Sequence, residues 1–211
     1  MSWSCGSTCA RRPALEPEGR LALAFAAIDA ENAGDPTSLE VGGELRPKEQ
    51  AHAEMAVDWV RRLRPDAGEV LLLAARAHHV RRWEIPRDSE PEGRAGYLRW
   101  KRRLQRHHAE VAGRILAGVG YDEATIGRVQ AIVTKERLRD DPEVQTLEDA
   151  LALVFVETQF TELADRLDED HMVDVVVRTL RKMTPTGREA AQDLPLGERD
   201  AAIVSRAVSL L

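Results

Sequence analysis

The sequence predicts an all-α protein, organised as a single helical domain of about eight helices over residues 18–211, with at most one short β-hairpin near residues 38–46. Apolar residues recur at intervals of three and four along most segments, which indicates helices with one buried face. Glycine, proline and aspartate mark the breaks between these segments. At 211 residues and 43% hydrophobic content, the chain is long enough to bury one full core.

In the first half of the chain, we expect an alanine-rich helix over residues 21–30. Gly42-Gly43 between two short extended pieces predicts a tight hairpin, because both central positions of a type I′ turn need positive φ. Proline opens the next helix, over residues 47–63, at a position where its missing N–H costs little. The helix over residues 69–80 is apolar nearly all round and is therefore expected at the centre of the fold.

The second half begins with a break over residues 83–96, which hold two prolines and two glycines. A loop of this length exceeds the usual connection in a compact domain, and such loops commonly carry function. A long helix is expected to follow, over about residues 97–117. Four more helices are expected over residues 122–133, 141–160, 169–183 and 197–210.

Composition places few bounds on the class of protein. The net charge is −6, and no apolar run approaches the roughly 18 residues of a membrane span. Cys5 and Cys9 lie in a Ser/Gly-rich leader, residues 1–17, which we expect to be disordered, so a solvated tail is favoured over a zinc site. Without a disulfide framework, the expected location is the cytoplasm, with no membrane association.

Charge is concentrated in one segment. Residues 76–106 hold ten basic and four acidic side chains, a local net charge of +6 in an acidic protein. A basic island of this kind favours a small anionic ligand over general nucleic-acid binding, which usually involves a basic domain. The alternative is that these arginines pair with the acidic surplus of neighbouring helices.

Histidines are concentrated in the same region. Four of the six lie in two adjacent pairs, His78-His79 and His107-His108. Histidines on helices are typical ligands of divalent metals, and nearby arginines are typical ligands of phosphate. Because adjacent helical residues point about 100° apart, each pair is expected to supply one ligand. We choose His79 and His108.

Two further ligands are expected from other helices. His52 lies on the preceding helix, and Asp149 lies in an apolar helix, where a carboxylate is costly unless something pairs with it. The predicted set for a divalent ion (Mn, Fe, Zn or Co) is therefore His52, His79, His108 and Asp149. Two alternatives remain open: His52 as a half-exposed surface residue, and Asp149 as part of a helix-starting capping box that begins at Thr146.

The order His52, His78-His79, His107-His108, Asp149 resembles the HD-domain superfamily of metal-dependent phosphohydrolases. In that family a histidine, a His-Asp doublet and a distal aspartate on successive helices bind a divalent metal. The resemblance implies an HD-like helical domain. One departure is that the doublet reads His-His, so the aspartate that bridges two metals is missing. Lys135 stands where some two-metal relatives have another histidine, so a dinuclear site is not expected.

A closer resemblance covers nearly the whole chain, from about residue 21 to residue 210. It is carried by ARAHHVRRWEIPR, GRAGYLRWKRRL, HAEVAGRIL, GYDEATIGRVQ and QTLEDALALVFVE, which are similar to the family known as domain of unknown function 4202 (DUF4202). The doublet in that family usually reads Gln-His, which matches His79 and makes His78 the departure. The other positions of the pattern are Arg82, Trp83, Pro86, Arg87, Gly96, Tyr97, Trp100, His108, Glu148 and Asp149. The resemblance implies a fold and a set of positions, and no reaction.

The first functional hypothesis is a metal-dependent phosphohydrolase acting on a small phosphorylated or nucleotide substrate. The ion would activate a water molecule and polarise the phosphoryl oxygens. Arg82, Arg87 and Lys101 would hold the phosphate, and arginine can do so with two parallel hydrogen bonds. Glu148 or Glu110 would be the general base.

The second hypothesis is a non-catalytic HD-like module that binds an anionic ligand or RNA through its basic, aromatic loop. Trp83, Tyr97 and Trp100 would then stack on a ligand or base while the arginines contact phosphates. Alternatively, the three aromatic side chains serve as core or loop anchors.

Overall fold

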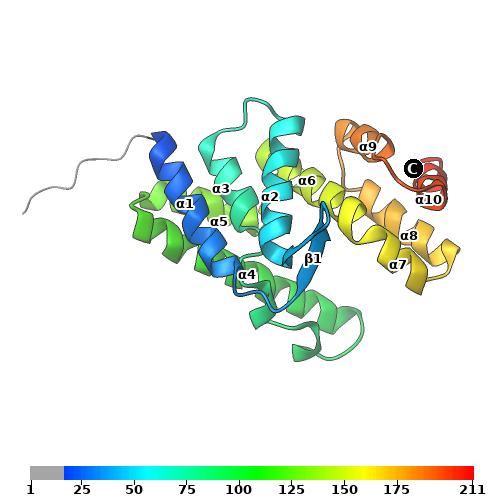
Figure 1. The fold of residues 1–211 in the computed structure, drawn as a ribbon, viewed down its shortest axis with the longest axis horizontal. Coiled ribbons are helices and arrows are strands. Elements are labelled where there is room, and N and C mark those ends of the chain that lie inside the picture. The colour runs from blue at the N-terminus through cyan, green and yellow to red at the C-terminus, as the bar shows by residue number, and fades with distance from the viewer. Residues whose placement is uncertain (1–16) are drawn as a thin grey trace, which may run out of the picture.

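The structure is a computed structural model that describes residues 17–211. This part of the chain forms ten α-helices, two short 3-10 helices and one two-stranded hairpin, which confirms the all-α prediction (Figure 1). The predicted leader, with Cys5 and Cys9, lies outside the described residues except for Pro17, which begins the first helix.

The N-terminal part contains the hairpin and three helices. Both glycines of the turn have positive φ, 61° at Gly42 and 86° at Gly43, and Val41 lies opposite Glu44, so the predicted hairpin is confirmed. The elements are α1 (Pro17–Asn32), β1 (Ser38–Val41), β2 (Glu44–Pro47), α2 (Lys48–Leu63) and α3 (Glu69–Ala77).

The middle part contains the long helix. Its start lies three residues before the predicted one, directly after Gly93, and it ends at Gly120, whose φ is 94°. Asp141 caps the last helix of this part by accepting hydrogen bonds from the Glu143 and Val144 N–H groups. Thr146 therefore lies inside a helix, and the capping-box alternative was wrong. The elements are η1 (Arg82–Glu84), η2 (Arg87–Ser89), α4 (Arg94–Val119), α5 (Glu123–Val133) and α6 (Pro142–Thr158).

The C-terminal part holds two helices more than expected. The predicted helix over residues 141–160 breaks at Gln159, whose φ of −128° is not helical. Thr184 and Pro185 start a helix that periodicity had not indicated, with the Thr184 side chain as its cap. The elements are α7 (Phe160–Arg166), α8 (Glu169–Leu180), α9 (Pro185–Gln192) and α10 (Glu198–Val208), which gather at one end of the molecule (Figure 1).

Helix α3 lies at the centre of the fold, as its sequence predicts. Leu71 and Leu73 are fully buried, and the helix packs against α1, α2, α5 and α6. Its C-terminal end is followed by a turn that contains the first histidine pair. Among residues 17–211, no helix combines the length and apolar character needed to cross a membrane.

Candidate functional site

Two ionisable residues lie on the first turns of α2. Glu49 and His52 are three residues apart, so both side chains lie on one face of the helix. The start of the helix is anchored because Asp35 accepts a hydrogen bond from the Glu49 N–H, at 2.9 Å. Both side chains are nearly inaccessible, with 5% exposure for Glu49 and 3% for His52. A buried carboxylate in such a position requires a partner.

His79 comes from the turn after α3. The turn is held by Arg81, whose φ of 54° is left-handed and whose N–H donates to the Asn32 side chain at 3.1 Å. From the opposite side, the His108 ring on α4 donates from Nδ1 to the Val80 carbonyl oxygen, at 2.8 Å. Contacts from α1 and α4 therefore fix the position of His79.

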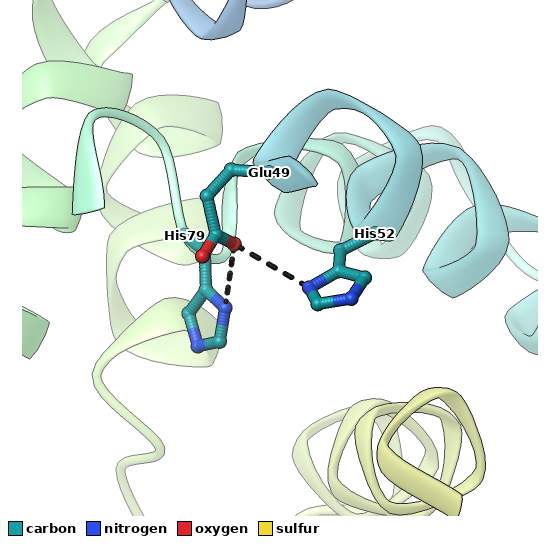
Figure 2. Close-up of side chains that lie close together, drawn as sticks. All are labelled: Glu49, His52 and His79. Atoms are coloured by element: carbon teal, nitrogen blue, oxygen red, sulfur yellow. Dashed lines mark hydrogen bonds and ion pairs between the residues drawn. The ribbon is translucent and has the colours of Figure 1, made fainter. Parts of the chain in front are cut away.

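Glu49, His52 and His79 converge on one point (Figure 2). Glu49 Oε2 lies 3.1 Å from His79 Nδ1 and 3.7 Å from His52 Nδ1. One ligand atom from each residue lies within 4.8 Å of the other two, and in residues 17–211 this is the one cluster of His, Cys, Asp and Glu with that property. For metal–nitrogen bonds of about 2.0–2.1 Å, neighbouring ligand atoms are roughly 3–3.5 Å apart, so small shifts suffice to admit an ion.

The tautomer of His52 can be assigned from its hydrogen-bond partners. Thr158 on α6 donates its hydroxyl proton to the Val154 carbonyl at 2.7 Å, so it must accept from His52 Nε2, 3.1 Å away. The proton of neutral His52 is therefore on Nε2, and Nδ1 presents a lone pair to the Glu49 carboxylate. Two acceptors that face each other are unfavourable unless a cation lies between them. The arrangement fits a metal ion.

The electrostatics of the cluster favour metal binding at neutral pH. Burial alone raises the pKa of Glu49, but the neighbouring His79, which donates a hydrogen bond from Nδ1, and the positive charge of Arg82 outweigh it and hold the pKa well below its usual range. Burial lowers the pKa of His79 to about 4, against the attraction of Glu49. The carboxylate is thus ionised and His79 is neutral at pH 7, the forms that metal ligands must have.

The cluster lies in a groove made of two adjoining hollows. The larger has a volume of about 620 Å³ and contains Glu49, His52 and His79. The smaller, about 210 Å³, extends toward Lys101 and Lys135. The two share six lining residues: His78, His79, Arg82, Tyr97, Trp100 and Leu151.

Cationic side chains are held against the aromatic wall of this groove. The Arg82 guanidinium lies 5.2 Å from the centre of the Trp100 ring and also forms a 3.4 Å ion pair with Glu49. Arg87 lies 5.7 Å from Trp100 and 5.8 Å from the Tyr97 ring. Each guanidinium group already has one contact, Arg82 with Glu49 and Arg87 with the Glu90 carbonyl oxygen, and has further N–H groups with which it could bind a planar or tetrahedral anion. Lys48 also lines the larger hollow.

Two more histidines border the groove without joining the cluster. The His108 ring lies 5.5 Å from the His79 ring, and its Nε2 is buried without a hydrogen-bond partner. His78 donates from Nδ1 to the Ala75 carbonyl at 2.8 Å. Burial lowers the pKa of both rings, so both are neutral at pH 7. Of the predicted ligands, the structure therefore brings together His52 and His79 and places His108 beside them.

Asp149 does not lie with the histidines. Its carboxylate accepts hydrogen bonds from the Thr184 N–H at 3.1 Å, from the Thr184 hydroxyl and from the Gln145 amide at 3.0 Å. It therefore connects α6 to the start of α9. Its burial in the apolar helix, which the sequence interpretation attributed to a metal, is explained by these hydrogen bonds.

The two predicted bases are also outside the cluster. Glu148 forms ion pairs with Lys135 and, at 3.7 Å, with Lys182. Although burial raises its pKa, the charge of Lys135 prevails and the pKa is lowered, so Glu148 is ionised and engaged by the two lysines. Glu110 is exposed and lines shallow depressions on another face of α4, with Arg106 as a neighbour.

Among the predicted substrate contacts, Trp83 is the one outside the groove. An atom of its ring lies close to Gly34, at the end of α1, and it lines neither hollow. Trp100 lines both hollows but is only 8% exposed, and its indole N–H donates to the Ile85 carbonyl at 3.0 Å. Tyr97 is 44% exposed and is the accessible aromatic of this wall.

Glu49 is the residue that sequence reasoning missed. Its signal is the spacing Glu-x-x-His at residues 49–52, which puts a carboxylate and an imidazole on one helical face.

The family profile described as "Domain of unknown function (DUF4202)" matches residues 22–204. The chain belongs to the DUF4202 family. The matched stretch of this DUF4202 protein contains Glu49, His52 and His79 together with both hollows of the groove. Neither a curated protein nor a solved structure matches this DUF4202 chain.

Proposed function

We propose that the protein is a metal-dependent phosphohydrolase that acts on a small phosphorylated substrate. The observation that carries this proposal is the convergence of Glu49, His52 and His79 in a groove whose walls hold Arg82 and Arg87. A site for a divalent cation beside fixed guanidinium groups provides both charges that a phosphate ester needs for binding and activation.

The residues fit a catalytic rather than a structural metal site. Structural zinc sites use four protein ligands, whereas two histidines and one glutamate leave at least one position open for water or substrate. When bound, a divalent ion lowers the pKa of a coordinated water and polarises a phosphoryl oxygen. His52 has the partner expected of a ligand, because its other ring nitrogen donates to Thr158.

The proposal retains the distant likeness to HD-domain phosphohydrolases in a modified form. His52 on α2 and His79 after α3 follow the helix order of that superfamily, while Glu49 supplies the carboxylate that we had assigned to Asp149. With one carboxylate and two imidazoles, the cluster is suited to a single ion. Its identity among Mn, Fe, Zn and Co is left to measurement.

The basic side chains would bind and orient the phosphate. Arg82 and Arg87 lie near the Trp100 ring and contact Glu49 and the Glu90 carbonyl oxygen, so both have partners that hold them before a ligand binds. Fixed donors lose little conformational entropy on binding, which favours orientation of the substrate. Arg82 also contacts Glu49, so it lies where it would contact an anion bound at the cluster.

One observation favours the alternative of a non-catalytic module for an anionic ligand or RNA. Tyr97 is 44% exposed at the rim of the groove, and Arg94, Arg99, Arg102, Arg103 and Arg106 are exposed along the same helix. Two observations argue against base stacking on a broad aromatic platform. Trp100 is buried, and Trp83 lies near Gly34, outside the groove. This alternative predicts ligand binding without metal.

The deciding experiment is metal content, measured by elemental analysis on untagged protein after reconstitution with each candidate ion. We expect about one equivalent in the wild type and its loss in Glu49→Gln and His79→Ala. His171→Ala is the matched control, because His171 is exposed at the start of α8. Hydrolysis of a panel of phosphate monoesters should follow the metal content. No metal in any sample would reject the enzyme and favour the binding module.

A further inference from the structure

The smaller hollow ends in a group of lysines that the metal cluster does not use. Lys101 on α4 and Lys135 after α5 both line it, and Lys182 lies behind them near Glu148. Three lysines against one glutamate leave two positive charges in excess. Such an excess beside a cavity favours an anion within it.

Lys135 is held in place by two features. Its side chain pairs with Glu148, and both groups are mostly buried, with side-chain exposures of 22% and 11%. Its backbone has a φ of 61°, an unfavourable conformation for a residue other than glycine. Strained backbone of this kind persists where the surrounding structure demands it and is enriched at ligand sites.

Lys101 is the free cation of the pair. Within residues 17–211 it forms no ion pair, whereas Lys135 and Lys182 share Glu148. Burial, with the repulsion of Lys182, lowers the pKa of Lys101 against the attraction of Glu148, so the charged form would be stabilised by an acidic partner in direct contact. An anionic ligand in the hollow would provide one.

Apolar side chains line part of the groove that contains the two lysines and the metal cluster. Leu104, Val133 and Leu147 line the smaller hollow, and Leu151 lines both hollows. Trp100 and Tyr97 also line both hollows. Apolar and aromatic walls favour an uncharged portion of a ligand.

We propose that Lys101 and Lys135 form a second anion subsite, and that the substrate is a small molecule with an anionic group at each end and an uncharged middle. One end, a phosphate ester, lies at Glu49, His52 and His79 with Arg82. The other end, a second phosphate or a carboxylate, lies between the two lysines. This inference rests on the proposed function for the identity of the first site, and it deepens that function by defining the class of substrate.

The test uses simple probes on protein that has been reconstituted with the ion, with affinities measured by calorimetry. The probes are alkane bisphosphonates of increasing length, the corresponding ω-phosphonocarboxylates, and alkyl monophosphonates of the same lengths. At the length that spans the groove, a probe with two charged ends should bind about tenfold tighter than the monophosphonate, because it gains one charge-assisted contact. The bisphosphonate and the phosphonocarboxylate together show which second anion is preferred.

Lys101→Met retains the apolar stem and should abolish this tenfold advantage while leaving monophosphonate affinity unchanged. Lys101→Glu should reverse it. Arg102→Met is the matched control, since Arg102 is the exposed neighbour on the same helix and should keep the advantage. Equal affinity for singly and doubly charged probes at every length, or an advantage that survives in Lys101→Met, would overturn the proposal.

The failure of this inference is separable from that of the proposed function. If the protein binds one metal ion and hydrolyses monoesters but shows no preference for doubly charged probes, the proposed function stands and the second subsite is rejected. If the protein prefers doubly charged probes through Lys101 but never binds metal, the enzyme is rejected and the second subsite stands as part of a binding module.

Discussion

The indole N–H of Trp100 donates to the Ile85 carbonyl oxygen, 3.0 Å away, and both side chains are buried. With Leu104 they form a small apolar cluster of their own, separate from the main core. This contact attaches the segment that carries Arg82 and Arg87 to α4. The positions of Arg82 and Arg87, the proposed phosphate ligands, therefore depend on a satellite cluster rather than on helix hydrogen bonds.

Trp100→Phe should loosen this segment. Loss of the indole hydrogen bond is expected to lower the free energy of unfolding by about 1–2 kcal/mol. Inorganic phosphate should bind several-fold more weakly, because both guanidinium groups lose part of their platform. Urea denaturation and phosphate titration measure the two effects. Trp59→Phe is the control, because the Trp59 indole donates to Glu157 and not to the segment that carries Arg82 and Arg87. Its loss should lower the free energy of unfolding and leave phosphate affinity unchanged.

Thr158→Val should weaken metal binding without damaging the fold. Valine cannot accept from His52 Nε2–H, so the ring loses the contact that sets its tautomer. Loss of such a partner commonly costs about 10–100-fold in metal affinity. Competition with a chromophoric chelator measures the affinity. Thr179→Val removes a hydroxyl with the same hydrogen bond to its own helix and should have no effect on the metal. Equal affinities in the two variants would contradict the role of Thr158.

Asp149→Ala should destabilise the protein and leave the metal stoichiometry unchanged. The variant leaves the Thr184 N–H without its acceptor and leaves the Gln145 amide with only the Lys182 carbonyl. Buried groups that lose a charged partner cost about 2–4 kcal/mol in the free energy of unfolding. Chemical denaturation and elemental analysis of the folded fraction check both parts. Metal lost from well-folded Asp149→Ala would restore this residue to the ligand set.

The ion pair between Asp141 and Arg128 should make stability depend on pH. Hydrogen bonds from Arg128 lower the pKa of Asp141 to about 2, below the value of about 3.9 in an unfolded chain. The contribution is therefore present above pH ~4 and is lost as pH falls from ~4 to ~2. Asp141→Asn keeps a good N-cap, so the difference from wild type isolates the charge: about 0.5–1 kcal/mol at pH 7 and near zero at pH 2.

Unfolding in urea at several pH values measures this difference. Asp122→Asn offers the comparison, because Asp122 also caps a helix but forms no ion pair with an arginine among residues 17–211. Its difference from wild type should be smaller at every pH. A gap between wild type and Asp141→Asn that persists at pH 2 would show that the ion pair is not its cause.

Much of the fold can be predicted from the sequence because it is determined locally. Gly42-Gly43 requires a turn with positive φ, and Asp141-Pro142 starts a helix regardless of its neighbours. The break at Gln159 is different, since no glycine or proline lies between residues 150 and 170, and α7 packs against α8 and α10. Tertiary packing decides such a break, and periodicity does not reveal it.

The candidate site divides in the same way. The sequence indicates His52 and His79 because histidines next to apolar residues are rare and chemically specific. Glu49 was missed and Asp149 was misassigned because the partner of a buried carboxylate depends on how helices cross. Asp149 meets Thr184, 35 residues later, and Glu49 meets His79, 30 residues later. Sequence spacing on one helix indicates neither contact.

The left-handed Arg81, whose N–H donates to Asn32, joins the last residue of α1 to the turn that carries His79. Docking of α1 and ordering of the turn that carries His79 are therefore coupled. By thermodynamic linkage, if docking of α1 stabilises the position in which His79 binds a ligand, a ligand bound to His79 stabilises the docked position of α1 by the same free energy. A ligand bound deep in the groove would then slow amide exchange in a helix that it never touches.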